Sequence, residues 1–475
     1  MYSPQDTDWN RFWSRSASQQ FGQPGWSKQR ILKVLEPYAV DGKKTLDAGC
    51  SMMKYGKIIF IVLCVLSLFI PGAAAQEVLI WQDCLREAAR NHPDLVVAHE
   101  SVEQSKTQKT VAASGLFPQV TASAGLSTAQ ADKTGNTKSS SYGISGEQLL
   151  FDGFKTTNSA HSASENIKAA NENFRFTSSQ VRLRLRTAFI DLLKAQALVK
   201  IADDIYKIRR ENVQLISLRY ESGTEHRGAL LTAQANLSEA EFEQRRAHRD
   251  IEVARQGLMK ELGRQGQDLS PVQVQGEFTV TEDIKQKPGL EMLAEKHPDL
   301  LKTVAQKNAA AYDIKSSKGD FAPTVSLEAG ASKTGVDWPP GDQGSDVGLR
   351  VSLPLFEGGL RMAQLKQARS IYRQLQASEH STKDGVVLRL QEAWSSLENS
   401  VENIGVQQKF LAATEERAKI SEAQYSVGLI SFDNWTIIED DLVRQKKSFL
   451  DAQANALLAQ ANWIEAKGET LEYEE

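Results

Sequence analysis

Few residues of this 475-residue chain have the types and spacing that catalysis or metal binding requires. The 7 histidines are scattered, and no group of His, Cys and Asp has the spacing of metal ligands. Cys50 and Cys64 lie in segments that we expect to be absent from the mature protein, so Cys84 has no disulfide partner and is interpreted as a small buried residue. Residues 77–475 contain no nucleophile–base–acid set and no phosphate-binding loop. The sequence therefore predicts no catalytic residues, no metal and no cofactor, and so no enzyme.

The charge and hydropathy of the chain limit its partners. The formal net charge is only -4, and acids and bases are mixed throughout, so nothing in the balance points to nucleic acid as a partner. After residue 76 no stretch approaches the roughly 20 apolar residues that a transmembrane helix needs. A chain of this kind could span a membrane only as strands of a closed barrel.

Residues 52–75 have the three parts of a secretory signal peptide in order: a charged start, an apolar run and a small-residue cleavage site. The parts are Lys54 and Lys57, the run 58–70, and the site Ala73, Ala74 and Ala75. We therefore expect export of the chain and cleavage before Gln76.

Residues 1–51 precede this signal peptide and form an unexpected leader. The stretch from Ile31 to Leu35, followed by Gly42 to Cys50, resembles the opening helix and first strand-to-loop of S-adenosylmethionine-dependent methyltransferases. The chain departs from that pattern after Cys50, where the remaining glycines should follow, and one strand cannot build a cofactor cleft. We expect residues 1–51 to be a non-native leader, a truncated methyltransferase-like fragment without activity.

The mature part contains an internal repeat. Four motifs recur at one offset of 205 positions, with no net gap. The pairs are His92-Pro93-Asp94-Leu95 with His297-Pro298-Asp299-Leu300, Pro118 with Pro323, Phe151-Asp152-Gly153 with Phe356-Glu357-Gly358, and Tyr220-Glu221-Ser222-Gly223 with Tyr425-Ser426-Val427-Gly428. The repeat predicts two halves of like fold, residues 76–263 and 289–470. A breaker-rich segment, 264–288, joins them, and a short tail, 471–475, follows.

Each half contains segments with a period of two residues, which is typical of strands with one apolar and one polar face. The apolar positions are Val120, Ala122, Ala124 and Leu126 in the first half, and Val325, Leu327, Ala329, Val347, Leu349, Val351, Leu353 and Leu355 in the second. Loops rich in Gly, Ser, Thr, Lys and Asp are expected between the strands, at 129–141 and 332–345. The sequence thus predicts one β-hairpin with a long polar loop in each half.

A very long helical stretch follows each hairpin. Residues 155–220 contain neither Pro nor Gly, and 360–424 contain no Pro. About 65 helical residues extend on the order of 100 Å, too long for a compact domain. The apolar positions of the first stretch follow the 3-4 spacing of a coiled coil; they are Leu198, Ile201, Ile205, Ile208 and Leu215. A shorter helix is expected to return after each turn, at 227–263 and 432–468.

Two hairpins supply four strands, which are too few to close a barrel and leave two edges unpaired. Three copies would supply twelve strands with the length and alternation of outer-membrane strands. The same assembly would gather the helices into a tube beneath the barrel. The pattern therefore predicts oligomerisation into a water-filled conduit.

The duplicated order of helix, hairpin, long helix and helix resembles the TolC family of outer-membrane efflux proteins over residues 77–470. The resemblance implies a mainly α fold with a membrane β-barrel portion, in a homotrimer with a twelve-stranded barrel and an α-helical periplasmic tunnel. It implies the exit duct of a tripartite efflux or type I secretion system in the bacterial outer membrane. The implied partners are outer-membrane lipid, a periplasmic adaptor (membrane fusion) protein, and an inner-membrane efflux pump or ABC exporter.

The resemblance also implies a docking site for the adaptor. In this family a Val-Gly-Leu/Thr motif at each helix–helix turn receives the adaptor's hairpin tips. Val427-Gly428-Leu429 matches this motif, whereas Ser222-Gly223-Thr224 departs from it at Ser222. A plain helix C-cap would also require each glycine, and one residue can serve both roles.

The family's closed aperture is often lined by acids just beyond this turn. The corresponding positions here are Asn434 and Ile437, so the usual acidic pair is absent. Asp433, or the run Glu439-Asp440-Asp441, is expected to substitute, because threefold symmetry would gather such acids into a cation-attracting ring. The aperture residues are thus taken as Tyr425, Asp433, Asn434, Asp440 and Asp441. A solvated helix start, where acids suit the helix dipole, is an equally weighted reading.

The main alternative function is a secreted or periplasmic coiled-coil structural protein without channel activity. Such a protein would not need two amphipathic hairpins at equal positions of the repeat. The pattern therefore favours the channel.

Overall fold

The computed structural model describes residues 77–131, 135–264, 272–280 and 287–471. The chain divides into two units, 1–73 and 74–475, and the described residues all belong to the second. The leader at 1–51, the signal peptide at 52–75 and the cleavage site at Ala73, Ala75 and Gln76 lie outside the described residues.

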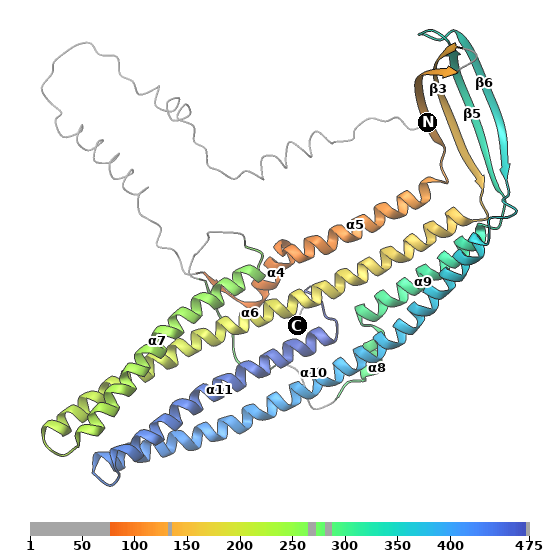
Figure 1. The fold of residues 1–475 in the computed structure, drawn as a ribbon. Helices are drawn as coiled ribbons and strands as arrows, with labels where there is room; N and C mark the ends of the chain where they lie inside the picture. The colour runs from red at the N-terminus through yellow and green to blue at the C-terminus, as the bar shows by residue number, and fades with distance from the viewer. Residues whose placement is uncertain (1–76, 132–134, 265–271, 281–286, 472–475) are drawn as a thin grey trace, which may run out of the picture. The chain divides into compact units, whose positions relative to one another are not determined.

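The described part is mainly helical (Figure 1). Its helices are α4 (Trp81–Asn91), α5 (Pro93–Ser114), α6 (Lys155–Glu221), α7 (Arg227–Glu261), α8 (Leu290–Glu295), α9 (Pro298–Gly319), α10 (Leu360–Ser426) and α11 (Phe432–Ala466). The counterparts α5 and α9 have 22 residues each, α6 and α10 have 67, and α7 and α11 have 35. Each of the three later helices begins 205 residues after its counterpart. No helix within the described ranges is long and apolar enough to cross a membrane.

The long helices lie side by side. Helix α6 packs along α5, α7, α9 and α11, while α10 packs along α9 and α11 (Figure 1). The buried positions of α6 near its C-terminal end are Ala202, Arg209 and Ile216, each seven residues after the last. The predicted coiled-coil positions Ile201, Ile205 and Ile208 are not this seam; they line a groove of about 410 Å³ that α10 and α11 also border. The fully buried seam of the single chain therefore lies one residue after the predicted positions Ile201, Ile208 and Leu215.

Four antiparallel strands form one sheet in the order β2-β3-β5-β6. They are β2 (Gln119–Ala131), β3 (Gly135–Phe151), β5 (Thr324–Gly335) and β6 (Asp342–Ser352). Cross-strand partners share a face, and the register pairs Ala122 with Ile144 and Leu327 with Leu349. The predicted apolar positions of the strands therefore lie together on one face.

The strand ends differ from the prediction. The segments expected as long polar loops are mostly strand, and the second hairpin turns within residues 336–341. Leu353 and Leu355 lie beyond the end of β6. Residues such as Ser139, Ser140 and Ser141 lack an apolar alternation, but their backbone groups still complete the ladder.

The start of the described chain is fixed against the segment between the halves. Strand β1 (Val78–Leu79) pairs in parallel with β4 (Gln273–Val274). Both strands join a core with Leu185 and Leu258, which also contains Cys84. Cys84 is fully buried as predicted, and burial raises the pKa of its thiol to about 12. This core anchors α4 and the end of α7 onto α6.

Candidate functional site

Both long helices end in the same backbone motif. Gly223 after α6 and Gly428 after α10 have φ angles of 75° and 78°, a conformation that L side chains rarely adopt. Each glycine and the residue after it donate their N–H groups to carbonyls of the last helical turn, at 3.0 and 2.9 Å in the first turn and 3.1 and 2.8 Å in the second. This is the Schellman motif, in which the helix cap alone already favours glycine at both positions.

The two turns present different surfaces. In the first, the hydroxyls of Ser222 and Thr224 both donate to the carbonyl of Arg219, at 2.9 and 3.0 Å. In the second, the side chains of Val427 and Leu429 are 71% and 74% exposed. The first turn is therefore polar and closed by its own hydrogen bonds, and the second offers two apolar side chains to solvent.

An aromatic cluster packs between the helix ends that the two turns connect. Tyr425, at the end of α10, and Trp435, in α11, stack with ring centroids 4.6 Å apart and planes 6° apart. Phe432 packs edge-on against both rings. Ile216 of α6 and Ala229 of α7 complete this buried cluster. Residues from both turns thus share one small core.

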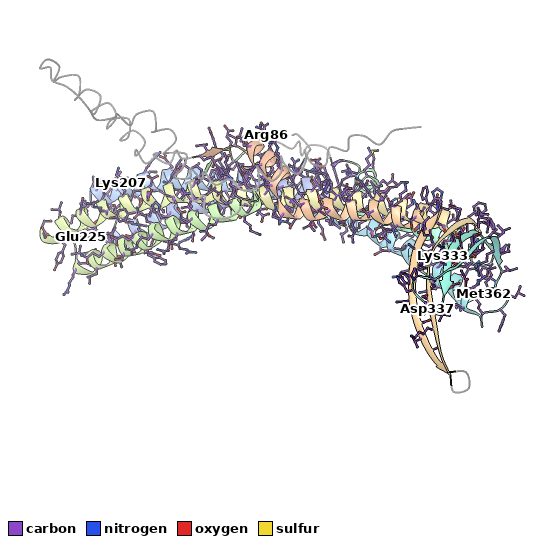
Figure 2. The ribbon with its side chains drawn as sticks, turned by 90° about the horizontal axis from the view of Figure 1, so that it is seen from above. Arg86, Lys207, Glu225, Lys333, Asp337 and Met362 are labelled. Carbon is purple, nitrogen blue, oxygen red and sulfur yellow. The ribbon has the colours of Figure 1, made fainter. Side chains whose placement is uncertain are left out.

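Polar contacts also join the first turn to the second (Figure 2 labels Glu225 in the first turn). The Arg219 guanidinium donates to the carbonyls of Tyr425 (3.3 Å) and Ser426 (3.0 Å) and lies 4.4 Å from the centre of the Tyr425 ring. The Tyr425 hydroxyl donates to the Glu225 carboxylate at 2.9 Å. Burial, and then this carboxylate, raise the pKa of Tyr425 to about 12, so the phenol keeps its proton to donate.

The predicted aperture residues have different surroundings. Tyr425 is buried in the aromatic cluster rather than exposed at an opening of the single chain. Asp440 forms an ion pair with the buried Arg209 of α6, at 2.5 Å. Asp433 and Asn434 are exposed in the first turn of α11. The structure therefore brings Asp433 and Asn434 to the surface near the turn and ties Asp440 to the neighbouring helix.

The remaining predicted acid, Asp441, is also paired. It lies 3.5 Å from Arg417 of α10 and 3.2 Å from Arg444 of α11. Its neighbour Glu439 is partly buried beside the groove described above, and desolvation raises the pKa of its carboxyl group. Asp433 thus differs from Asp440 and Asp441, because within the described part of the chain it forms no ion pair.

Three residues of this site are not predicted from the sequence: Arg219, Glu225 and Trp435. None belongs to a motif, and each acts on a residue of another helix or turn. The spacing of Tyr425, Phe432 and Trp435, by seven and three positions, is the one local signal of the cluster. Among the residues that the structure describes, no group of three or more His, Cys, Asp or Glu side chains could hold a metal ion.

Comparisons with known proteins identify the family. The family model described as "Outer membrane efflux protein" matches residues 84–264 and 289–474. The outer membrane efflux protein BepC of Brucella suis is 25% identical over 402 residues, which are 83% of this chain and 86% of that protein. The alkaline protease secretion protein AprF of Pseudomonas aeruginosa is 23% identical over 298 residues, 59% of this chain and 62% of that protein.

A solved structure shares the fold. The crystal structure of CusC superimposes with a TM-score of 0.72 at 18% identity, covering 81% of this chain and 91% of that one. The family match spans both halves of the chain and contains both glycine turns. The chain belongs to the outer membrane efflux protein family.

Proposed function

We propose that this outer-membrane protein is the exit duct of a tripartite efflux or type I secretion system, a passive conduit for substrates that an inner-membrane pump delivers. The observation that carries the proposal is the pair of 67-residue helices, each following a strand of one amphipathic sheet and ending in an exposed glycine turn. At 1.5 Å per residue each helix spans about 100 Å, so a duct built from them would reach far from the membrane.

The working assembly is a homotrimer. The sheet of one chain has β2 and β6 at its edges, and its apolar face is exposed, with Leu349 62% accessible. An open edge and an exposed apolar face both require partners. Three chains would join edge to edge into a twelve-stranded barrel with apolar residues toward lipid and polar residues toward the lumen. The twofold repeat of helix lengths would then place six long columns around the tunnel below.

The glycine turns are the docking site for a periplasmic adaptor. Val427 and Leu429 expose apolar side chains on either side of Gly428. Ser222 and Thr224 flank Gly223, and their hydroxyls are already hydrogen-bonded to a carbonyl at the end of α6. An adaptor tip would therefore meet apolar side chains at one turn and a polar surface at the other. The second turn would carry most of the binding, since burying apolar area is the main source of affinity.

Asp433 and Asn434 border the aperture, with Asp433 supplying the charge. Asp440 and Asp441 would stabilise the closed arrangement through their ion pairs, and Tyr425 would do so through the aromatic cluster. Three copies of Asp433 near one axis would attract cations.

The export signal completes the proposal. Residues 52–75 would direct the chain across the inner membrane, and cleavage before Gln76 would leave residues 1–51, the methyltransferase-like fragment, outside the mature protein.

The experiment combines localisation with conductance. The full coding sequence is expressed in a strain without its own exit duct, and membranes are fractionated. A heat-resistant trimer in the outer membrane that conducts ions in planar bilayers is the expected result. A monomer in the periplasm without conductance would reject the duct and favour a coiled-coil structural protein.

A further inference from the structure

The chain contains two equivalent joints, each between a helix start and the glycine that ends another helix. In the first joint, Gly263 after α7 lies against Asn91 and His92 before α5; in the second, Gly468 after α11 lies against His297 and Pro298. A Cβ atom on either glycine would collide with these neighbours. The His-Pro-Asp motif of each half thus lies at a joint that leaves no room for a side chain in place of the glycine.

Each joint contains a buried histidine in a defined tautomer. The N–H of Asp94 donates to Nδ1 of His92 at 3.1 Å, and the N–H of Asp299 donates to Nδ1 of His297 at 3.2 Å. A ring nitrogen that accepts a hydrogen bond carries no proton, so the neutral ring carries its proton on Nε2. Both joints therefore point an Nε2–H donor into the interior.

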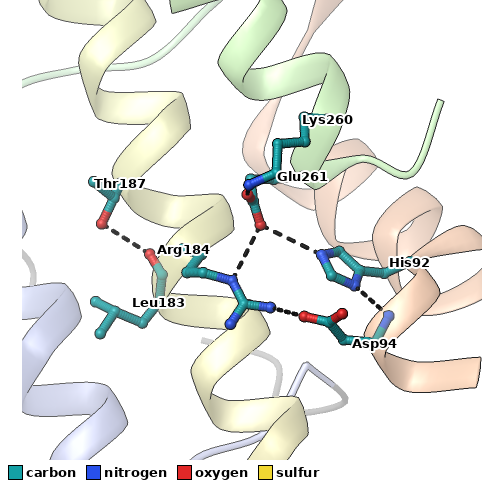
Figure 3. Close-up of polar contacts among 7 residues, drawn as sticks. All are labelled: His92, Asp94, Leu183, Arg184, Thr187, Lys260 and Glu261. Carbon is teal, nitrogen blue, oxygen red and sulfur yellow. Dashed lines mark hydrogen bonds and ion pairs between the residues drawn. The ribbon is translucent and has the colours of Figure 1, made fainter. Parts of the chain in front are cut away.

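The first joint supplies an acceptor for that donor (Figure 3). Nε2 of His92 lies 3.3 Å from a carboxylate oxygen of the buried Glu261. Glu261 also accepts from Nε of Arg184 at 3.3 Å and from Nζ of Lys260 at 2.9 Å, and Arg184 forms a further ion pair with Asp94. The Nε2–H of His92 therefore has a buried carboxylate as its acceptor.

The second joint lacks this acceptor. The position 205 residues after Glu261 is Ala466, and its side chain is buried. Within the described residues, Nε2 of His297 has no hydrogen-bond partner, and the residue is fully buried. A buried donor without an acceptor is costly, and adding a positive charge to it costs more.

The charged groups that face His297 do not compensate. The cations are Arg389 of α10, Arg175 of α6 and Lys302 of α9, and the acid is Asp299 of α9. Glu465 of α11 interacts with Arg389 and Asp299. Asp299 is already paired with Lys302 at 2.9 Å and lies 3.7 Å from Arg389. In the turn after α11, Lys467 and Glu469 pair with each other at 2.7 Å. Burial, and then Arg389, lower the pKa of His297 from 6.5 to about 4.

We propose that the second joint is an acid-triggered release, in which protonation of His297 separates the start of α9 from the turn after α11 while the first joint stays closed. The proposal concerns the folded chain itself and does not depend on the duct function. Its pH window follows from the two pKa values. Above pH 6.5 the ring is neutral in the open and closed joint alike, so the joint is fully stable. Between 6.5 and about 4 only the open joint binds the proton. The equilibrium constant for opening therefore rises about tenfold for each unit by which the pH falls in that window.

Amide hydrogen exchange measured by mass spectrometry on the full chain tests this proposal. Protection is expressed relative to an unstructured peptide at each pH, from pH 7.5 to 4, for peptides 298–305 and 464–471 of the second joint and 93–100 and 259–264 of the first. We expect protection to fall about tenfold per pH unit in the second joint and to change little in the first. Equal pH dependence in the two joints would overturn the proposal.

Two variants make the test specific. His297→Asn keeps a side-chain acceptor for the helix cap but cannot titrate, so the pH dependence of the second joint should disappear. Glu261→Ala removes the acceptor of the first joint, and that joint should then acquire the pH dependence. Glu261→Ala tests the proposal even if His297→Asn does not fold. A first joint that still ignores pH without Glu261 would contradict the proposed role of the carboxylate.

Discussion

The imidazole of His92 and the carboxylate of Glu261 lie 3.3 Å apart inside the molecule, although 169 positions separate them in the sequence. The equivalent imidazole, His297, is buried as deeply but has Ala466 at the position of the carboxylate. The two halves thus share a backbone joint and differ in the polar group that completes it.

This difference predicts unequal effects of one substitution at the two sites. His92→Leu and His297→Leu both remove a helix cap, which costs about 1 kcal/mol. His92→Leu also removes a donor from the buried Glu261, which adds about 1–3 kcal/mol. Urea unfolding of both variants at pH 7.5 should therefore show the lower midpoint for His92→Leu. Equal midpoints would mean that the His92–Glu261 contact contributes nothing to stability.

Replacing Glu439 by glutamine should stabilise the folded protein at neutral pH but not at acid pH. Desolvation holds the pKa of the Glu439 carboxyl group above the ordinary value of 4.5, so the folded state binds a proton more tightly than the unfolded state. The stability that this carboxyl contributes is complete below pH 4.5 and is lost as the pH rises through the raised pKa. Glu439→Gln should be more stable than the natural chain at pH 7.5 and equal to it at pH 4. Glu402→Gln, at an exposed position of α10, serves as the control and should show no such difference.

The faces of the sheet can be tested by charge. Leu349, Val351 and their partners Leu327 and Val325 share the apolar face, and Ser352 lies on the other. If the apolar face meets lipid, Leu349→Arg or Val351→Arg should each cost about 2–4 kcal/mol at mid-bilayer and reduce the amount of trimer in the membrane. Ser352→Arg should assemble normally and change single-channel conductance. The opposite pattern, with Ser352→Arg failing to assemble, would mean that the faces are reversed.

The glycine turns predict a separation of folding from docking. Nothing lies within 4 Å of a Cβ atom built on Gly223 or Gly428, and both residues have positive φ. A Cβ atom at either position therefore meets no neighbour, and a substitution costs about 1–2 kcal/mol of backbone strain. Gly428→Trp should give normal trimer but no resistance to exported drugs, because the indole would keep an adaptor from reaching Val427 and Leu429. Gly223→Trp should be milder. Loss of trimer in Gly428→Trp would mean that the glycine cap is needed for folding, and full resistance would mean that the turn takes no part in docking.

The processed N-terminus is a further prediction. Protein extracted from outer membranes should begin at Gln76, because residues 52–75 have the three parts of a signal peptide with a small-residue site before Gln76. Mass spectrometry of the intact protein measures this directly. Mature protein that still carried residues 1–51 would contradict the assignment.

The order and length of the elements could be predicted from the sequence, because each depends on local composition. Long stretches without proline give the 67-residue helices, and Arg227 and Phe432 begin the returning helices as expected. The period of two residues gives the faces of the strands. The strand ends could not be predicted in this way, since serine and glycine in the outer parts of the hairpins carry no apolar alternation, and their pairing depends on the neighbouring strand.

The contacts that complete each site depended on the tertiary structure. Gly223 and Gly428 could be identified from their motifs, because a left-handed backbone needs a particular residue type. Three contacts could not be identified from the sequence: those of Arg219 with Tyr425, Arg209 with Asp440 and Glu261 with His92. Each of these side chains acts on a residue of another helix, and a charged residue on a helix has the same local pattern whether it faces water or a partner. Only the packing of the helices against one another decides which charges meet, and which histidine is left without an acceptor.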